Sequence, residues 1–294
     1  MPATIFDDKD QKVSLSDIDT DPPKKITKEH AAARFEVLNE ELFMLQDRMW
    51  GAKTHAVLVV LQGRDAAGKD GAIKHVVGAL NPRGVLVTSF GVPTPEEREH
   101  DFLWRVHKHA PRKGEVAIFN RSHYEDVLVV RVHDLVPKPL WKERYGHIND
   151  FEELLTEHNT IVLKFFLHIS KNEQEKRLLE READPKTAWK LNAGDWKERE
   201  KWDEYTEAYE DVLRRCSTKR APWHVVPSDA KWYRNLVIAE AIAAAMRPHL
   251  EEWEEKLEAE GVAGRRSLDE YRAARRGSGH GAGHGSSHGP KANG

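Results

Sequence analysis

The sequence predicts an α/β protein built on a parallel sheet that helices cover on both faces. Continuous apolar segments of strand length alternate along the chain with segments of helical periodicity, as expected for strands that are buried on both faces. Five such strands indicate one doubly wound domain with three layers, α/β/α. A glycine-rich stretch, GRDAAGKDG from Gly63 to Gly71, lies between the first of these strands and the helix that follows it.

The chain length and composition set the broad class. The chain has 294 residues, of which 39% are hydrophobic and 32% charged, which is typical of a soluble globular protein. A formal net charge of -3 gives no reason to expect a nucleic-acid partner. The single cysteine, Cys216, excludes an internal disulfide. No apolar run can span a bilayer and the N-terminus is polar, so we expect a cytoplasmic enzyme without membrane contact.

The individual elements follow from apolar periodicity and from turn residues. Residues 1–26 are charged and interrupted by prolines, so we expect a flexible arm. The strands are predicted at 56–62, 85–90, 115–120, 160–169 and 223–228. The helices are predicted at 27–50, 68–80, 96–110, 170–182 (with a capping box from Ser170 to Glu173) and 229–260. Residues 124–136 fit either a strand or a crossover helix, and the Gly/Ser/His-rich end, 261–294, predicts a disordered tail.

The glycine-rich stretch has the features of a phosphate-binding loop. Glycines allow tight turns and close approach of the backbone, and the helix N-terminus after Gly68 favours an anion. Lys69 can reach the phosphates as a cation. The predicted phosphate contacts are Gly63, Ala66, Ala67, Gly68, Lys69, Asp70 and Gly71. The alternative is a glycine-rich connector without a ligand.

Two aspartates in this loop predict a metal ion. Asp70 occupies the position where serine or threonine is usual, and Asp65 lies inside the loop. A carboxylate can bind Mg²⁺ directly or through water, and the ion then bridges phosphate oxygens. Asp65 can also position the phosphate acceptor, so we predict it as the metal ligand. Asp70 has the alternative role of stabilising the helix N-terminus.

Five segments of the chain together resemble the polyphosphate kinase 2 family. They span residues from about 27 to 246 and read GRDAAGKDGAI, FNRSHYEDVLVVRVH, KFFLHISKNEQEKRLLER, WKLNAGDW and APWHVVPSDAKWYRNL. The segment SHYEDVLVVRV resembles the class III branch, whose members phosphorylate both AMP and ADP.

The resemblance implies a P-loop kinase fold similar to thymidylate kinase, with five parallel strands over residues 27–260 and a helical lid at about 170–210. It implies reversible transfer of a terminal phosphoryl group between inorganic polyphosphate and AMP or ADP, with GMP and GDP as further candidates. Mg²⁺ is the implied cofactor, with Mn²⁺ as a substitute. The loop would hold polyphosphate in place of ATP. The amphipathic N-terminal helix and the aromatic residues suggest a homo-oligomer, dimeric or tetrameric.

The resemblance also assigns roles to individual residues inside and outside the loop. Asp65 and Lys69 match the family's loop aspartate and lysine, and Arg121 matches the arginine after the third strand, which gives a catalytic set of three. Arg177 and Arg181 match lid arginines and, with Lys231, are predicted to bind polyphosphate. The nucleotide is predicted to contact Asn120, Arg121, His123, Glu125 and Asp126.

Each of these assignments has an alternative. Arg121 follows the C-terminal end of a central strand, where α/β sheets bind ligands, but it could instead form an ion pair with Glu125 or Asp126. Those two acids could also belong to a solvated helix face, as could the lid arginines. Many family members have aspartate in place of Asn120. Class III members share the asparagine, which moves metal binding toward Asp65, with Glu125 or Asp126 as further candidates, and leaves the full ligand set open.

Two other functions share the loop and the lid. One is an ATP-dependent P-loop kinase that acts on a nucleotide or another small molecule. The other is a non-catalytic module that binds polyphosphate or nucleotide, against which the two loop aspartates argue. The phosphoryl donor distinguishes an ATP-dependent kinase from a polyphosphate-dependent one. Turnover in the presence of Mg²⁺ distinguishes an enzyme from a binding module.

Overall fold

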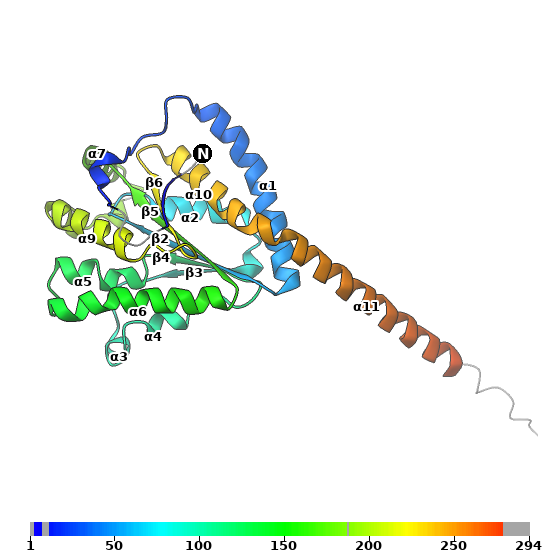
Figure 1. Cartoon of the computed structure of the whole chain (residues 1–294). Helices are drawn as coiled ribbons and strands as arrows, with labels where there is room; N and C mark the ends of the chain where they lie inside the picture. Colours follow the sequence, from blue (N-terminus) through cyan, green and yellow to red (C-terminus); the bar gives the residue numbers. More distant parts are fainter. Residues whose placement is uncertain (1–2, 8–11, 187, 279–294) are drawn as a thin grey trace, which may run out of the picture.

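A six-stranded mixed sheet forms the centre of the protein (Figure 1). The computed structural model describes residues 3–7, 12–186 and 188–278. The strand order is β1-β6-β5-β2-β4-β3, and neighbouring strands from β2 to β6 run parallel. The strands are β1 (Thr4–Phe6), β2 (Ala56–Gly63), β3 (Val85–Ser89), β4 (Val116–Asn120), β5 (Thr160–His168) and β6 (Trp223–Pro227). The five predicted parallel strands are confirmed.

The sixth strand corrects the prediction for the N-terminal arm. Thr4–Phe6 pairs antiparallel with β6, so the sheet is not purely parallel and this part of the arm is not loose. Phe6 and Leu15 are buried, and Thr20 Oγ1 donates a hydrogen bond to Asp229 Oδ2 at 2.9 Å. Three residues with one inward-facing aromatic side chain give too little periodicity to predict a strand.

Helices cover both faces of the sheet, which confirms the three-layer arrangement (Figure 1). Successive residues of β2 point to opposite faces: Val57, Val59 and Leu61 join one core, and Leu58 and Val60 join the other. The first core packs under α1 (Lys28–Ala52), α2 (Lys69–Val76) and α10 (Lys231–Met246). The second packs under α5 (Val129–Val132), α6 (Lys138–Glu157) and α9 (Trp202–Arg215).

Two predicted helices are divided by local signals. The helix predicted over 96–110 is two short helices, α3 (Pro95–Arg98) and α4 (Trp104–His107). The carboxylate of Asp101 accepts hydrogen bonds from the backbone N–H groups of Leu103 and Trp104 and so begins a new turn. The ambiguous stretch 124–136 contains no described strand; it forms a 3-10 turn, η4 (His123–Asp126), followed by α5.

The C-terminal helix also differs from the prediction. Pro248 lies in the turn Arg247–His249. Proline has no backbone N–H to donate to the preceding turn of a continuous helix, so α10 and α11 (Leu250–Ser278) are separate helices. Because α11 continues to Ser278, the predicted start of the tail at 261 is wrong, and residues 279–294 lie outside the described part. No helix among the described residues, α11 included, is both long and apolar enough to cross a membrane.

The predicted lid region contains α7 (Lys171–Ala183) and α8 (Ala193–Glu200). Ser170 Oγ accepts the backbone N–H of Glu173, which is half of the predicted capping box. The other half is absent, because Ser170 N donates to Asp229 and the Glu173 carboxylate pairs with Arg177. The predicted boundary at 210 falls within α9, whose Ala208, Tyr209, Val212 and Leu213 are buried in the core.

Four buried histidines predict that acid destabilises the fold. Burial lowers the pKa of His55, His123, His168 and His224 below the ordinary value of 6.5. The unfolded chain therefore binds more protons than the folded chain as the pH falls below about 6.5, and stability is lost in that direction. Each histidine contributes up to about 1.4 kcal/mol per pH unit.

We expect the free energy of unfolding, measured with urea, to fall as the pH is lowered from 7.5 to 5, and the dependence on pH to be the sum of these histidine contributions. His168→Gln and His224→Gln should each reduce the slope. The exposed His75→Gln should leave it unchanged. A free energy that stays constant down to pH 5.5 would contradict this prediction.

Candidate active site

The glycine-rich loop joins β2 to α2 at the C-terminal edge of the sheet, where parallel α/β sheets bind ligands. Gly68 has φ +102°, and a Cβ atom there would lie 1.9 Å from Nη1 of Arg234. Both the backbone conformation and the close guanidinium therefore require glycine at this position. Ala66 also lies in the left-handed region, with φ 60°. The loop is thus held in a fixed curved conformation with a cation directly against it.

Lys69 is buried beneath the loop. Its Nζ donates hydrogen bonds to the carbonyl oxygens of Gly63 at 2.6 Å and Arg64 at 3.2 Å. Burial, with the positive charge of Arg121 nearby, lowers the pKa of Lys69 to about 8. Phosphate oxygens would supply the negative charge that these neutral carbonyls do not.

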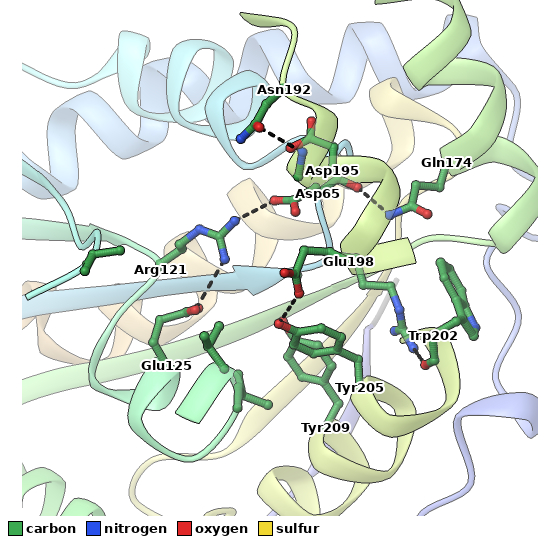
Figure 2. Close-up of a pocket in the computed structure, with 16 residues that line it drawn as sticks. Asp65, Arg121, Glu125, Gln174, Asn192, Asp195, Glu198, Trp202, Tyr205 and Tyr209 are labelled. Carbon is green, nitrogen blue, oxygen red and sulfur yellow. Dashed lines mark hydrogen bonds and ion pairs between the residues drawn. The ribbon is translucent and has the colours of Figure 1, made fainter. Parts of the chain in front are cut away.

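Arg121 connects two carboxylates at the end of β4 (Figure 2). Its Nη2 lies 2.5 Å from Asp65 Oδ1, and its Nη1 lies 3.3 Å from Glu125 Oε2. The residue has φ 61°, an uncommon conformation for an arginine that often marks a functional position. The ion pair that was the alternative for Arg121 is therefore present with Glu125, and it includes the loop aspartate. The three groups form one charged cluster, and a metal or a phosphate group would redistribute its contacts.

Two adjoining hollows meet at this cluster. The first is a cavity of about 340 Å³. Its wall includes Gln174, Trp202, Tyr205 and Tyr209, of which Tyr205 donates a hydrogen bond to Glu198 (Figure 2). The second is an open groove of about 1180 Å³ that follows the loop. Both are lined by Asp65, Arg121, Asn192 and Asp195.

The groove is rich in cations. The lysines and arginines that line it are Lys28, Lys69, Arg121, Arg177, Arg181, Lys231 and Arg234. Arg234 is almost fully buried, and the only hydrogen-bond partners of its guanidinium in the described chain are Ala67 O and the side chain of Asn235. Burial lowers the pKa of Arg234 to about 10. A buried arginine without a carboxylate partner favours an anionic ligand.

Asp195 is a site residue that the sequence predictions missed. It comes from α8 and accepts a hydrogen bond from Arg181 Nη1 at 2.6 Å. Burial and the nearby charge of Asp65 raise the pKa of Asp195. The segment WKLNAGDW contains it and carries part of the family resemblance, which was the one available signal.

Asn120 and Asp70 lie together on the groove wall. Asn120 Nδ2 donates to Asp70 Oδ1 at 3.1 Å and to Ser89 Oγ at 3.3 Å. Asn120 Oδ1 is buried and has no hydrogen-bond partner in the described structure. An unsatisfied oxygen beside a carboxylate is suited to a cation or its bound water.

Arg177 supports the loop from behind. Its guanidinium donates to the carbonyl oxygens of Ala66, Ala67, Ser228 and Asp229 and to the carboxylate of Glu173. These five bonds use all five of its N–H groups. In this arrangement Arg177 fixes the loop against β6 and does not present an N–H group to a phosphate, unlike the polyphosphate contact that the family resemblance implies for it. Lys231, by contrast, is exposed on the groove.

His123 and Asp126 lie outside both hollows. His123 is fully buried and contacts Glu152, and burial lowers the pKa of its imidazole. Asp126 forms ion pairs with Arg105 and Arg144. The predicted nucleotide contacts do not fit these positions, because η4 directs both side chains toward the protein interior. Glu125, between them in sequence, does line the cavity.

Comparisons with known proteins agree on one family. The sequence profile of Polyphosphate kinase 2 (PPK2) matches residues 25–254. An AMP/ADP-polyphosphate phosphotransferase from Meiothermus ruber is 52% identical over 219 residues, which are 74% of this chain and 82% of the relative. An ADP-polyphosphate phosphotransferase from Rhodopseudomonas palustris is 42% identical over 75% of this chain and 80% of its own length. The crystal structure of Polyphosphate Kinase 2 from Arthrobacter aurescens superposes with a TM-score of 0.79 at 39% identity and covers 84% of this chain and 92% of that one.

Proposed function

Since the chain belongs to the polyphosphate kinase 2 family, a family of polyphosphate-dependent nucleotide phosphotransferases, we propose that it transfers the terminal phosphoryl group of inorganic polyphosphate to AMP and to ADP. The observation that carries this proposal is the meeting of a long basic groove and a smaller cavity at Asp65 and Arg121. The groove suits an extended polyanion. The cavity suits one nucleotide, whose phosphate would reach the shared boundary.

Polyphosphate would lie along the loop. Lys69, Arg234 and the backbone N–H groups around Gly68, which line the groove, would surround its terminal phosphates. Three exposed or half-buried cations, Lys28, Arg181 and Lys231, would contact the remaining phosphate units of the polyphosphate. Arg177 would keep the loop in shape without contacting the polymer.

The residues present fit a divalent metal ion. Asp65 and Asp195 both line the boundary of the two hollows, and Asn120 Oδ1 and Asp70 offer further oxygen ligands on the groove wall. Mg²⁺ takes carboxylates and carbonyl oxygens and retains several waters, and Mn²⁺ has similar ligand preferences. Bound Mg²⁺ would neutralise phosphate oxygens and polarise the transferred group. We propose Asp65 as its principal ligand and Asp195 as the second.

The protein would act by positioning and by charge. Phosphoryl transfer between oxygens breaks the terminal P–O bond of the anhydride and forms a P–O bond to the nucleotide phosphate, so no covalent enzyme intermediate is needed. Lys69 and Arg121 would stabilise the equatorial oxygens of the in-line transition state. In the proposed lid, α7 stays fixed to the loop through Arg177, and Arg181 and Asp195 already line the groove. Closure of α8 over the boundary would exclude water, which limits hydrolysis.

A donor exchange assay tests the proposal. With polyphosphate and Mg²⁺, we expect AMP to give ADP and ATP, and one phosphate unit to be lost from the polymer for each phosphoanhydride formed. GMP and GDP in place of AMP and ADP report the base preference. Product formation should cease in the presence of a chelator of divalent cations.

Two outcomes would favour the other functions. Formation of GDP from GMP with ATP as the sole donor, and none with polyphosphate, would indicate an ATP-dependent kinase. Tight binding of polyphosphate without turnover in Mg²⁺ would indicate a binding module. Lys69→Met serves as the control for a contaminating activity.

A further inference from the structure

The distal part of α11 extends from the body of the protein as a single helix (Figure 1). All residues from 262 to 275 are exposed, including the apolar Val262 at 54%, Leu268 at 53% and Tyr271 at 59%. This part lies beyond residues 25–254, which the family profile matches. An isolated helix of about 15 residues is only marginally stable in water, so burial against another surface would stabilise it.

A groove on the opposite side of the sheet from α11 has an apolar lining against which a helix could pack. It lies between α6 and the segment that joins α3 to α4, with a volume of about 600 Å³. Its apolar lining is Phe102, Leu103, Leu140, Phe151 and Leu154, of which Leu140 and Leu154 are 52% and 46% exposed. On α6 the lining residues recur every three or four positions from 140 to 154, so they share one face of about 21 Å.

The charges of the helix and the groove are complementary. Residues 262–275 contain four arginines (Arg265, Arg266, Arg272 and Arg275) and two acids (Asp269 and Glu270), a net charge of +2. The groove contains Asp101, Glu143 and Asp150, and its one arginine, Arg144, is paired with Asp126. Neither Glu143 nor Asp150 forms an ion pair within the described chain. The lengths also agree, since residues 262–275 form about 21 Å of helix.

The helix cannot reach the groove of its own chain. The first turns of α11 pack on the core through Trp253 and Leu257, and α11 then runs straight away from α6 without a break (Figure 1). We propose that the distal part of α11 docks in the α4–α6 groove of a second copy of this chain. In a twofold dimer the exchange is reciprocal, and both helices bury Leu268 and Tyr271, which lie three residues apart on one side of α11.

Sedimentation velocity of the full-length chain over a range of concentrations tests this dimer. Leu268→Glu with Tyr271→Glu changes only the helix, and Leu140→Glu with Leu154→Glu changes only the groove. All four side chains are about half exposed, so the folded monomer tolerates the changes, as thermal unfolding can verify. We expect each pair to raise the dimer dissociation constant at least about tenfold. Val37→Glu with Phe43→Glu, an equally exposed apolar pair on α1, is the matched control and should leave it unchanged.

Site-directed crosslinking tests the contact itself. Two variants are prepared, Leu268→Cys in the helix and Leu154→Cys in the groove. Because the native Cys216 is buried, each variant carries one accessible thiol. A short bismaleimide should link the two chains in the mixture far more than in either sample alone. A monomer at all concentrations would overturn the proposal. The proposal would also be overturned if the two α1 substitutions alone dissociated the dimer, or if the two helix substitutions dissociated it and the two groove substitutions did not.

Discussion

Asp65→Asn is expected to reduce the turnover number of phosphoryl transfer from polyphosphate to ADP at least about a hundredfold, the usual effect of removing one preorganised charged group. Asparagine keeps the shape of the side chain and an oxygen for the 2.5 Å contact with Arg121 Nη2. It removes the negative charge that the proposed metal ion needs at the boundary of groove and cavity. The Mg²⁺ concentration for half-maximal rate should therefore rise as well.

Glu180→Gln is the matched control for Asp65→Asn. Glu180 also lines the groove, but its side chain is 55% exposed and lies away from the boundary with the cavity. Its loss should change turnover by less than about threefold, because an exposed charge is screened by solvent. Near-normal turnover in Asp65→Asn would exclude the metal role of Asp65, and equal losses in both variants would point to the overall charge of the groove instead.

The sequence predicted the parts of the site that are local. A strand, a glycine-rich turn and a helix N-terminus occupy consecutive residues, so Gly68, Lys69 and Asp65 could be assigned from their spacing. Arg121 could be assigned because it follows the end of a strand in a parallel sheet, where ligands bind. Its contact with Asp65, 56 residues away, is consistent with the pairing of β2 and β4.

The parts that depend on packing between distant segments could not be predicted. Arg234 lies against Gly68 because α10 follows β6 back across the sheet, and no periodicity in α10 reports that contact. Whether an acid after β4 faces the cavity or the interior depends on the turn η4. Glu125 lines the cavity while Asp126 turns to Arg144, although the two are adjacent.

Lys164 shows how the interior supports this turn. A lysine in the middle of a buried strand could have snorkelled to the surface or faced the phosphates. Instead its Nζ donates to Glu152 Oε2 and to Cys216 O, both at 2.5 Å, and to the Tyr124 hydroxyl at 3.1 Å. Tyr124 and His123, both in η4, contact the other carboxylate oxygen of Glu152. Although burial opposes ionisation, the charge of Lys164 and the hydrogen bond from His123 hold the pKa of Glu152 below its ordinary value.

Lys164→Met is therefore expected to lower the free energy of unfolding by about 3–5 kcal/mol, because it leaves the Glu152 carboxylate buried without its cation. The double variant with Glu152→Gln should recover at least half of this loss, since neither charge then remains unpaired. Urea unfolding at pH 7.5 measures both. Arg34→Met, which breaks the exposed pair of Arg34 with Glu240, is the control and should cost less than about 1 kcal/mol. If the double variant were less stable than Lys164→Met, the pair itself, and not the avoidance of an unpaired charge, would hold η4 in place beneath Arg121.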